Sequence, residues 1–375
     1  MPLIFISGGD LVLPDRVLEK SSLTIGDGRI AAVGAPPPPG ADVINASGKY
    51  VLPGLIDVHA HGRMISLDPL SIRDNLVQDC MDFAATGVTR FLPALASAPV
   101  AAWLASMPAL TDAINHPLVG AVPMGVHYEG IFLNPEAGGA HPGPLIKAFD
   151  ADDADHRALF ERWPGVVKMI TFAPEVGGNE KLIEICRAKG IVMSLGHSAA
   201  GPEEVARFAA QGVLHMTHLF NGMKGLNHRD PGPPLAGLLD DRISVDFICD
   251  GYHLHPEVVR LIHRMKPRDQ RILITDSVVI QMPGAEAGKV DEPNRLPGGV
   301  FAGSRLRLHS AVRNYMRFTG CPLPEAVSMA SLNPATLLGM QKTLGSLEPG
   351  KIADLWIADR DLEPEAVFVG GERIK

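Results

Sequence analysis

The chain has 375 residues, of which 46% are hydrophobic and 20% charged, and its 34 basic and 42 acidic side chains leave a net charge of −8. At about 150 residues per domain, this length provides one large or two smaller domains with a sizeable core. The acidic balance, without any Lys- or Arg-rich run, argues against binding to nucleic acid or to an anionic membrane surface. We expect any anionic ligand to be met by a few individually placed cations.

The cysteines and the apolar stretches bear on the compartment. Cys80, Cys186, Cys249 and Cys321 are far apart and form no C-x-x-C pair, which predicts reduced, buried thiols and no cysteine-based zinc site. The first residues contain no basic segment of a secretion signal, and the longest apolar stretch, around 91–110, is interrupted by proline. It falls short of the about 20 residues of a membrane span. We therefore expect a cytoplasmic protein.

The two ends of the chain have the same character. Residues 1–53 consist of short apolar runs separated by turns such as Gly26-Asp27-Gly28, a pattern typical of β-hairpins. Residues 345–375 repeat this pattern, with apolar runs over 353–357 and 366–369. Because each segment alone is too small for a stable sheet, we predict that 1–53 and 345–375 together form one small β-sandwich domain.

The middle of the chain, residues 54–344, alternates apolar, β-branched runs with helical patterns. Eight runs are candidate strands, over 55–58, 88–92, 121–126, 166–171, 191–195, 213–217, 243–248 and 272–275. Continuously apolar strands joined by helices are typical of a parallel sheet. We predict an α/β fold in which 54–344 is a (β/α)8 TIM-like barrel and the catalytic domain, with an open doubly wound sheet as the alternative.

Polar side chains follow five of these candidate strands. They are His59 and His61 after the first, Glu129 after the third, His197 after the fifth, His218 after the sixth and Asp276 after the eighth. Each alone has an ordinary explanation, such as a core histidine or a helix cap. In a barrel the carboxyl ends of the strands converge, so together they predict one pocket. Imidazole and carboxylate ligands without thiolate favour an open catalytic site for zinc first, or for iron, manganese or cobalt.

Several segments also resemble a known family. Residues 53–62, Pro-Gly-Leu-Ile-Asp-Val-His-Ala-His-Gly, are similar to the opening strand of the amidohydrolase superfamily. The segments 127–130, 139–142, 195–198, 217–223, 228–232, 250–253 and 274–276 are similar to the signature segments of N-acetylglucosamine-6-phosphate deacetylases. The resemblance implies metal-dependent hydrolysis of the acetamide of N-acetylglucosamine 6-phosphate, a small-molecule substrate, to glucosamine 6-phosphate and acetate in amino-sugar catabolism.

The resemblance further implies a role for each residue of the site. Glu129, His197 and His218 would hold the principal ion, and His59 and His61 would be available for a second ion bridged through Glu129. Asp276 would act as general base and then as general acid, and His141 would polarise the acetyl oxygen and stabilise the oxyanion. The sugar phosphate would be bound by Asn221, Gly222, Arg229 and His253, with Arg229 reaching the neighbouring active site of a homodimer.

The chain departs from the family pattern near the expected sugar pocket. Ile131 stands where proline is usual, 137–138 lacks a common basic residue, and 278–299 is divergent. A deacylase for N-acetylgalactosamine 6-phosphate or for another amide therefore stays open as the alternative, and a non-catalytic sugar-phosphate sensor is a third hypothesis, against which Asp276 argues. A carboxylated-lysine metal site is disfavoured because Lys168 lies early in its strand.

Overall fold

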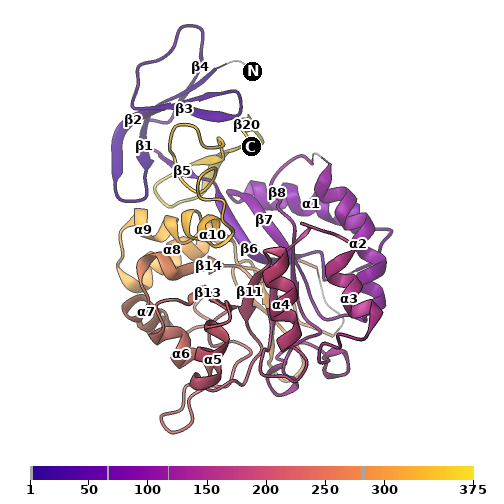
Figure 1. Ribbon diagram of the computed structural model, residues 1–375. Helices are drawn as coiled ribbons and strands as arrows, with labels where there is room; N and C mark the ends of the chain where they lie inside the picture. The colour runs from indigo at the N-terminus through magenta and orange to yellow at the C-terminus, as the bar shows by residue number, and fades with distance from the viewer. Residues whose placement is uncertain (1–2, 66, 117, 281–283) are drawn as a thin grey trace.

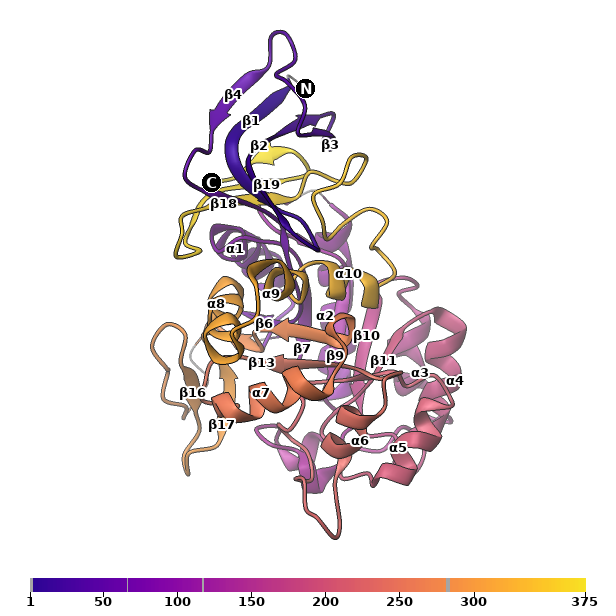
Figure 2. The same ribbon diagram turned by 90° about the vertical axis from the view of Figure 1, so that its left-hand side faces the viewer.

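The computed structural model describes residues 3–65, 67–116, 118–280 and 284–375. Its strands form two sheets. In Figure 1 the smaller sheet, which contains both ends of the chain, lies above a larger body in which helices surround the second sheet, and Figure 2 shows the same division from the side.

Eight strands make the smaller sheet, in the order β20-β19-β18-β5-β1-β2-β3, with β4 paired to β1. They are β1 (Ile4–Val12), β2 (Val17–Gly26), β3 (Arg29–Val33), β4 (Asp42–Asn45), β5 (Tyr50–Pro53), β18 (Leu355–Ala358), β19 (Pro364–Val369) and β20 (Glu372–Arg373). The two ends of the chain meet where β5 pairs antiparallel with β18. Asp27 and Gly28 turn β2 into β3 with positive φ of 50° and 73°, as the Asp-Gly hairpin pattern predicts.

Each of the eight apolar runs forms a strand of the larger sheet, and these strands are parallel. They are β6 (Leu55–Gly62), β7 (Val88–Leu95), β8 (Val122–Pro123) and β9 (Val126–Glu129), β10 (Val167–Phe172), β11 (Val192–Leu195), β12 (His215–Met216), β13 (Ser244–Ile248) and β14 (Arg271–Ile274). The third run is split into β8 and β9 because Gly125, with φ of 141°, interrupts it. Lys168 lies at the beginning of β10, away from the carboxyl end.

The larger sheet is curled. β14 pairs with β13 at one edge. The chain that leaves β14 continues as β15 (Ser277–Val278), which pairs in parallel with β6, the first of the eight predicted strands. β5 leads directly into β6, so the amino ends of the parallel strands face the smaller sheet. Their carboxyl ends therefore lie at the opposite end of the body.

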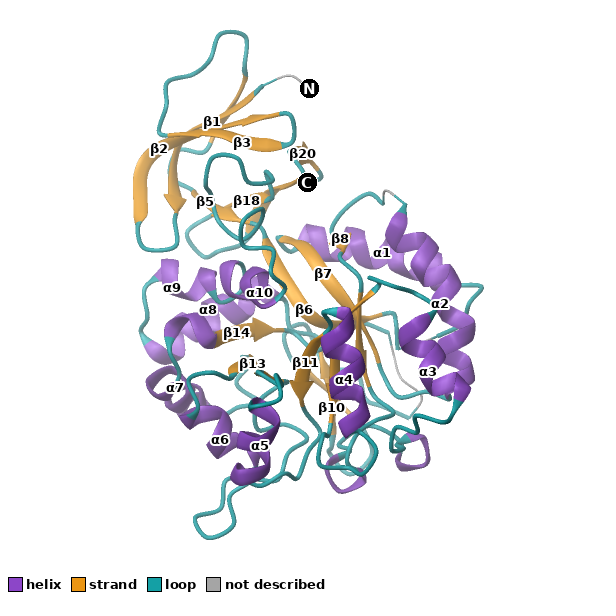
Figure 3. Cartoon of the chain, in the orientation of Figure 1, coloured by secondary structure: helices purple, strands orange, loops and turns teal. Residues whose placement is uncertain are grey.

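Helices surround the curled sheet, as Figure 3 shows. They are α1 (Ile72–Ala85), α2 (Val100–Asn115), α3 (Ala154–Glu161), α4 (Glu180–Lys189), α5 (Pro202–Ala209), α6 (Pro233–Leu239), α7 (Pro256–Met265), α8 (Leu308–Thr319), α9 (Leu323–Ser328) and α10 (Leu332–Leu337), with 3-10 turns at Pro135–Ala137, Gly143–Leu145 and Arg268–Gln270. Local sequence sets their ends. The Asp153 side chain accepts hydrogen bonds from the first amides of α3, and Gly190 ends α4 in the left-handed conformation.

The divergent segment after Asp276 contains structure that the sequence did not predict. β16 (Pro293–Arg295) and β17 (Phe301–Ser304) form an antiparallel pair, and β17 extends the larger sheet beside β15. Residues 281–283 of this segment lie outside the described residues. Within the described part of the chain, no helix is long and apolar enough to cross a membrane. The four cysteines are free and buried, as their spacing predicts.

Candidate active site

The polar residues that follow the parallel strands lie at one end of the curled sheet. His59 and His61 belong to β6, Glu129 closes β9, and His197, His218 and Asp276 each lie two residues beyond β11, β12 and β14. The last three have positive φ, at 47°, 32° and 49°. This conformation is uncommon outside glycine, costs about 1–3 kcal/mol per residue and clusters at functional sites. Backbone strain therefore marks the same strand ends that the sequence singled out.

Glu129 lies at the centre of this group and is 2% exposed. Its Oε2 is 3.1 Å from His59 Nε2 and 3.0 Å from His61 Nε2. Its Oε1 is 3.2 Å from His197 Nε2 and 2.9 Å from His218 Nε2. One carboxylate thus joins imidazoles from three different strands.

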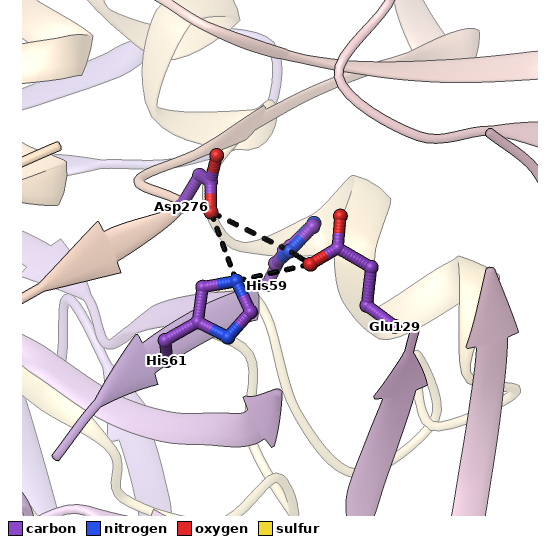
Figure 4. A group of neighbouring side chains, drawn as sticks. All are labelled: His59, His61, Glu129 and Asp276. Atoms are coloured by element: carbon purple, nitrogen blue, oxygen red, sulfur yellow. Dashed lines mark ion pairs between the residues drawn. The ribbon is translucent and has the colours of Figure 1, made fainter. Parts of the chain in front are cut away.

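Asp276 approaches the same group from the end of β14. Its Oδ1 is 3.2 Å from His61 Nε2 and 3.6 Å from His59 Nε2. In Figure 4 this oxygen faces the two imidazoles, while the second carboxylate oxygen points away from them. Asp276 lines the adjoining cavity, so a carboxylate oxygen is available to a ligand.

The donor atoms are close enough to hold metal ions. One ligand atom from each of His59, His61, Glu129 and Asp276 lies within 4.8 Å of the others, and the same is true of Glu129, His141 and His197. His218 belongs to neither group, although its Nε2 contacts Glu129. Within the described chain His59 Nε2 is buried and makes no hydrogen bond, although Glu129 Oε2 lies 3.1 Å from it. A cation between the imidazoles and the carboxylates would be coordinated by the lone pair of such a nitrogen.

The hydrogen bonds of the imidazole rings indicate which nitrogens are free. Nδ1 of His61 lies 2.9 Å from the carbonyl oxygen of Ala94, and Nδ1 of His197 lies 2.9 Å from that of Ala137. A carbonyl only accepts, so Nδ1 carries a proton in both rings. When either ring is neutral, its lone pair is therefore at Nε2. The His197 lone pair then faces a Glu129 oxygen, an arrangement that a cation stabilises.

The electrostatics of the site favour positive charge. Burial raises the pKa of Glu129, but the charge of His59 and a hydrogen bond from His141 help to lower it well below its usual value, so this carboxylate is ionised. Burial lowers the pKa of His61, yet hydrogen bonds to Asp276 and Glu129 raise it to about 10. Burial and the nearby His141 lower the pKa of His197 to about 4, which keeps this ring neutral.

A cavity of about 480 Å³ adjoins the group of imidazoles. Its walls include the expected substrate contacts His141, Asn221, Gly222 and His253, and an apolar side made by Ile65, Val278, Leu296, Val300 and Phe301. No lysine or arginine is found among the described residues that line it. Arg229 is exposed and lies outside the cavity, so one copy of the chain does not bring this expected phosphate ligand to the site.

Comparison with known proteins identifies the family. The model of the amidohydrolase family matches residues 50–374. The chain belongs to the amidohydrolase family. The predicted resemblance is therefore confirmed.

Individual relatives of this amidohydrolase are deacetylases. It is 31% identical over 373 residues to N-acetylgalactosamine-6-phosphate deacetylase of Escherichia coli O157:H7, covering 96% of this chain and 97% of that protein. It is 32% identical over 378 residues to N-acetylglucosamine-6-phosphate deacetylase of Bacillus subtilis (strain 168), covering 94% and 92%. A mutant N-acetyl-D-glucosamine-6-phosphate deacetylase of Mycobacterium smegmatis, solved with N-acetyl-D-glucosamine-6-phosphate, superposes with a TM-score of 0.89 at 27% identity and covers 100% of both chains.

Two of the expected substrate contacts of this amidohydrolase, His253 and Gly222, are closely held by their neighbours. His253 Nδ1 lies 2.6 Å from Asp250 Oδ2, and the Asp250 Oδ1 accepts the backbone N–H groups of Tyr252 and His253. Gly222 has φ of 57°, and a Cβ there would lie 2.5 Å from His197 Nδ1. The close approach of this backbone to the His197 ring therefore requires glycine.

The cavity is also lined by Ser97 and Phe301, for which the sequence predicts no role. Ser97 follows β7, which extends to Leu95, whereas the predicted strand ended at residue 92. Polar residues just after the strands are predicted to be site residues, so a strand predicted to end at Leu95 would also have indicated Ser97. Phe301 lies in β17, and its ring centroid is 4.8 Å from that of His253. Its segment has no periodic pattern that signals a strand.

Proposed function

We propose that this amidohydrolase cleaves the acetamide of N-acetylglucosamine 6-phosphate to glucosamine 6-phosphate and acetate, in amino-sugar catabolism. The observation that carries the proposal is the placement of four imidazole Nε2 atoms within 3.2 Å of the Glu129 carboxylate, with Asp276 beside them. The 32% identity to the Bacillus subtilis deacetylase of this sugar phosphate supports the choice of substrate.

The proposed metal ligands are the residues around Glu129. Glu129, His197 and His218 would hold the principal ion, and His59 and His61, together with Glu129, would hold a second ion if two bind. The nitrogen and oxygen donors, with no thiolate among them, fit zinc, with iron, manganese and cobalt as alternatives. When bound, a divalent cation would acidify water, which supplies the nucleophile, and would polarise the carbonyl that is attacked.

Residues of the chain carry the remaining steps. The Asp276 carboxylate takes a proton from the attacking water and returns it to the sugar nitrogen as the C–N bond breaks, so that acetate and the amine leave. His141 Nε2 donates a hydrogen bond to the acetyl oxygen and stabilises the charge that develops there. Asn221, Gly222 and His253 bind the sugar phosphate.

We propose a homodimer in which Arg229 of one subunit binds the phosphate in its neighbour's cavity. The absence of lysine and arginine from the described cavity wall leaves the phosphate without a strong cation in one subunit. The loop before α6, which carries Arg229, projects from the body at the end where the carboxyl ends of the strands lie (Figure 1 and Figure 2). Contacts across a two-fold axis are reciprocal, so in such a dimer each subunit would supply Arg229 to the other's cavity.

The finer architecture is part of the proposal. The parallel sheet of residues 54–344 closes into a (β/α)8 barrel, since the chain from β14 to β15 pairs with both β13 and β6. Residues 1–53 and 345–375 form a β-sandwich domain around an apolar cluster of their own, which includes Ile6, Leu23, Leu355 and Phe368. Four free thiols fit a reducing cytoplasm.

A second substrate is favoured by one comparison. The 31% identity to a deacetylase of N-acetylgalactosamine 6-phosphate from Escherichia coli O157:H7 extends over 96% of this chain. The two sugars differ only in the configuration at one hydroxyl, so the same metal and Asp276 chemistry serves either substrate.

Acetate release from three compounds tests the proposal: the two sugar phosphates and unphosphorylated N-acetylglucosamine. We expect the highest kcat/KM with N-acetylglucosamine 6-phosphate and a sharp loss without the phosphate. A higher value for the galactosamine epimer would replace the proposed substrate. Equal rates with and without the phosphate would contradict a phosphate site.

Asp276→Asn tests the mechanism. We expect this variant to retain its metal, measured by elemental analysis, and its binding of the sugar phosphate, because the amide keeps the size of the side chain. Turnover should fall by at least about 10³-fold, since an amide cannot accept and return a proton. Asp361→Asn, at an exposed position, is the matched control. Turnover at the rate of the unmodified enzyme would remove Asp276 from the mechanism.

A further inference from the structure

His141 differs from its neighbours in the partner of its Nδ1. The backbone N–H of Ser97 donates to His141 Nδ1 at 3.4 Å, whereas Nδ1 of His61 and of His197 each face a carbonyl oxygen at 2.9 Å. A neutral imidazole carries one proton, so a nitrogen that accepts a hydrogen bond is unprotonated and the other nitrogen carries the hydrogen. In its neutral form His141 is thus N–H at Nε2, the nitrogen at which a neutral His61 or His197 ring has its lone pair.

The protonated nitrogen of His141 decides whether this residue is a metal ligand or a hydrogen-bond donor to the substrate, which distances alone do not. A ligand atom of His141 lies within 4.8 Å of those of Glu129 and His197, and its Nε2 is 3.9 Å from Glu129 Oε2. By position His141 is therefore as well placed to bind a metal ion as to contact substrate. A nitrogen that carries a hydrogen cannot coordinate a metal, but it can donate to a carbonyl oxygen.

We propose that Ser97 is a positioning residue: its backbone N–H holds His141 as the Nε2–H tautomer, which makes His141 a hydrogen-bond donor to the substrate carbonyl and excludes it from the metal ligands. The donor role rests on the proposed amide hydrolysis. The tautomer itself rests only on the contact between Ser97 and His141.

The position of Ser97 is held from a second side. Its Oγ accepts the backbone N–H of Ile131 at 3.1 Å. Ile131 is fully buried and has φ of 61°, a strained conformation for a β-branched residue. A Cβ on Gly130 would lie 2.5 Å from the Ser97 nitrogen, so the two backbones are in close contact. The Ser97 hydroxyl therefore fixes the direction of the Ser97 N–H by binding the segment that follows Glu129.

The tautomer can be read directly in the full-length, zinc-loaded protein. Long-range 1H–15N spectra of the histidine side chains distinguish the two tautomers, and His141→Gln assigns the His141 signals. We expect His141 to be protonated at Nε2 and His61 and His197 at Nδ1. A His141 ring protonated at Nδ1 would overturn the proposal, whatever the behaviour of the variants.

Ser97→Ala tests the hydroxyl. We expect its His141 signals to shift towards a mixture of tautomers and kcat to fall about tenfold, with KM and metal content little changed, because only the donor fraction changes. Ser97→Thr keeps the hydroxyl and should restore kcat. Ser106→Ala removes another buried hydroxyl, which lies in α2 and donates to the Leu67 carbonyl, and controls for loss of stability. An unchanged tautomer and kcat in Ser97→Ala would overturn the role of the hydroxyl in orienting the backbone N–H.

These readouts separate this inference from the proposed function. If His141 is protonated at Nε2 but the enzyme releases no acetate from any amino-sugar amide, the tautomer assignment stands and the proposed hydrolysis falls. If acetate is released while His141 is protonated at Nδ1, the hydrolysis stands and the role of Ser97 falls.

Discussion

A side chain on Gly222 would occupy the space of the His197 ring, and three of the six predicted site residues that follow strands have left-handed backbones. At the scale of single residues, the site is thus built from unfavourable backbone conformations as well as from chemical groups. The bulk of the fold stabilises them, because the same residues are tied by hydrogen bonds such as that from Asp276 N to His59 O at 2.9 Å.

Glu129→Gln should prevent metal binding. The substitution removes the charge next to four imidazole nitrogens and gives one carboxylate position an N–H₂ group, which cannot coordinate. We expect the metal content, measured by elemental analysis of the purified variant, to fall at least about tenfold. Glu136→Gln, on the exposed 3-10 turn that follows, is the matched control. Full metal content in Glu129→Gln would show that the imidazoles alone hold the ion.

Connections between elements position the His197 loop. Glu175, which follows β10, accepts hydrogen bonds from Ala199 N at 2.8 Å, Ser198 Oγ at 2.9 Å and Asn134 Nδ2 at 3.0 Å. Asn134 N in turn donates to His197 O at 2.9 Å. One carboxylate therefore joins the ends of three neighbouring strands.

Glu175→Gln should disturb His197 without touching the metal directly. An amide replaces one of two accepting oxygens with a donor, so at least one of these hydrogen bonds is lost. We expect kcat to fall about tenfold and the free energy of unfolding to decrease by about 1–3 kcal/mol, measured by kinetics and urea unfolding. Glu184→Gln on the exposed face of α4 should change neither. Unaltered kinetics in Glu175→Gln would show that His197 does not depend on this carboxylate.

Asp291 attaches the divergent segment to the beginning of α8. Its carboxylate accepts hydrogen bonds from Arg307 N at 2.9 Å, Arg307 Nη2 at 2.8 Å and Ser310 Oγ at 2.9 Å. Burial raises the pKa of Asp291, but the hydrogen bonds from Arg307 outweigh burial and lower the pKa below its usual value of 3.8. The ionised carboxylate therefore stabilises the fold above about pH 3.8, and this contribution is lost as the pH falls towards the lowered pKa.

Asp291→Asn should make this contribution visible. Near pH 7 we expect the free energy of unfolding of the variant to be lower by about 1 kcal/mol. The loss is small because the carboxylate is partly exposed. In urea titrations the difference from the unmodified enzyme should shrink as the pH falls from about 3.8 towards the lowered pKa, because the unfolded chain then binds the proton more readily than the folded protein does. Asp15→Asn, at an exposed position beside Arg16, is the control. A difference that is independent of pH would assign the effect to shape and not to charge.

Much of the element order could be predicted because buried parallel strands are continuously apolar and because their carboxyl ends converge. The runs around Leu55, Val88 and Phe247 show this pattern. The short strands β16 and β17 could not be predicted, since half-exposed residues such as Arg295 and Gly303 carry no such pattern. The environment of Arg229 could not be predicted from one chain, because the contacts proposed for it belong to a second copy.

At the scale of the whole molecule, the proposed exchange of Arg229 between subunits can be tested by complementation. Arg229→Ala and Asp276→Asn should each have low activity alone, because each lacks one part of every site. In a mixed dimer, the subunit with an intact Asp276 receives Arg229 from its partner, so one site of two is complete. Random mixing makes about half of the dimers mixed, so co-expression should restore about a quarter of the unmodified activity.

The complementation has a direct control. Two variants that affect the same subunit's site, Glu129→Gln and Asp276→Asn, should not restore each other, because both residues act within one chain. Acetate release and sizing by light scattering measure the outcome. If Arg229→Ala and Asp276→Asn fail to complement while dimers form, Arg229 acts within its own subunit or not at all.

The antiparallel pairing of β5 with β18 affects how the newly made chain folds. During synthesis β5 leaves the ribosome about 300 residues before its partner, so an unsatisfied strand edge waits while the curled sheet is being made. The smaller sheet can be completed only after translation has passed β18. A chain truncated between α10 and β18 should therefore have amino-terminal strands that protease cuts, while the helices around the larger sheet are already protected.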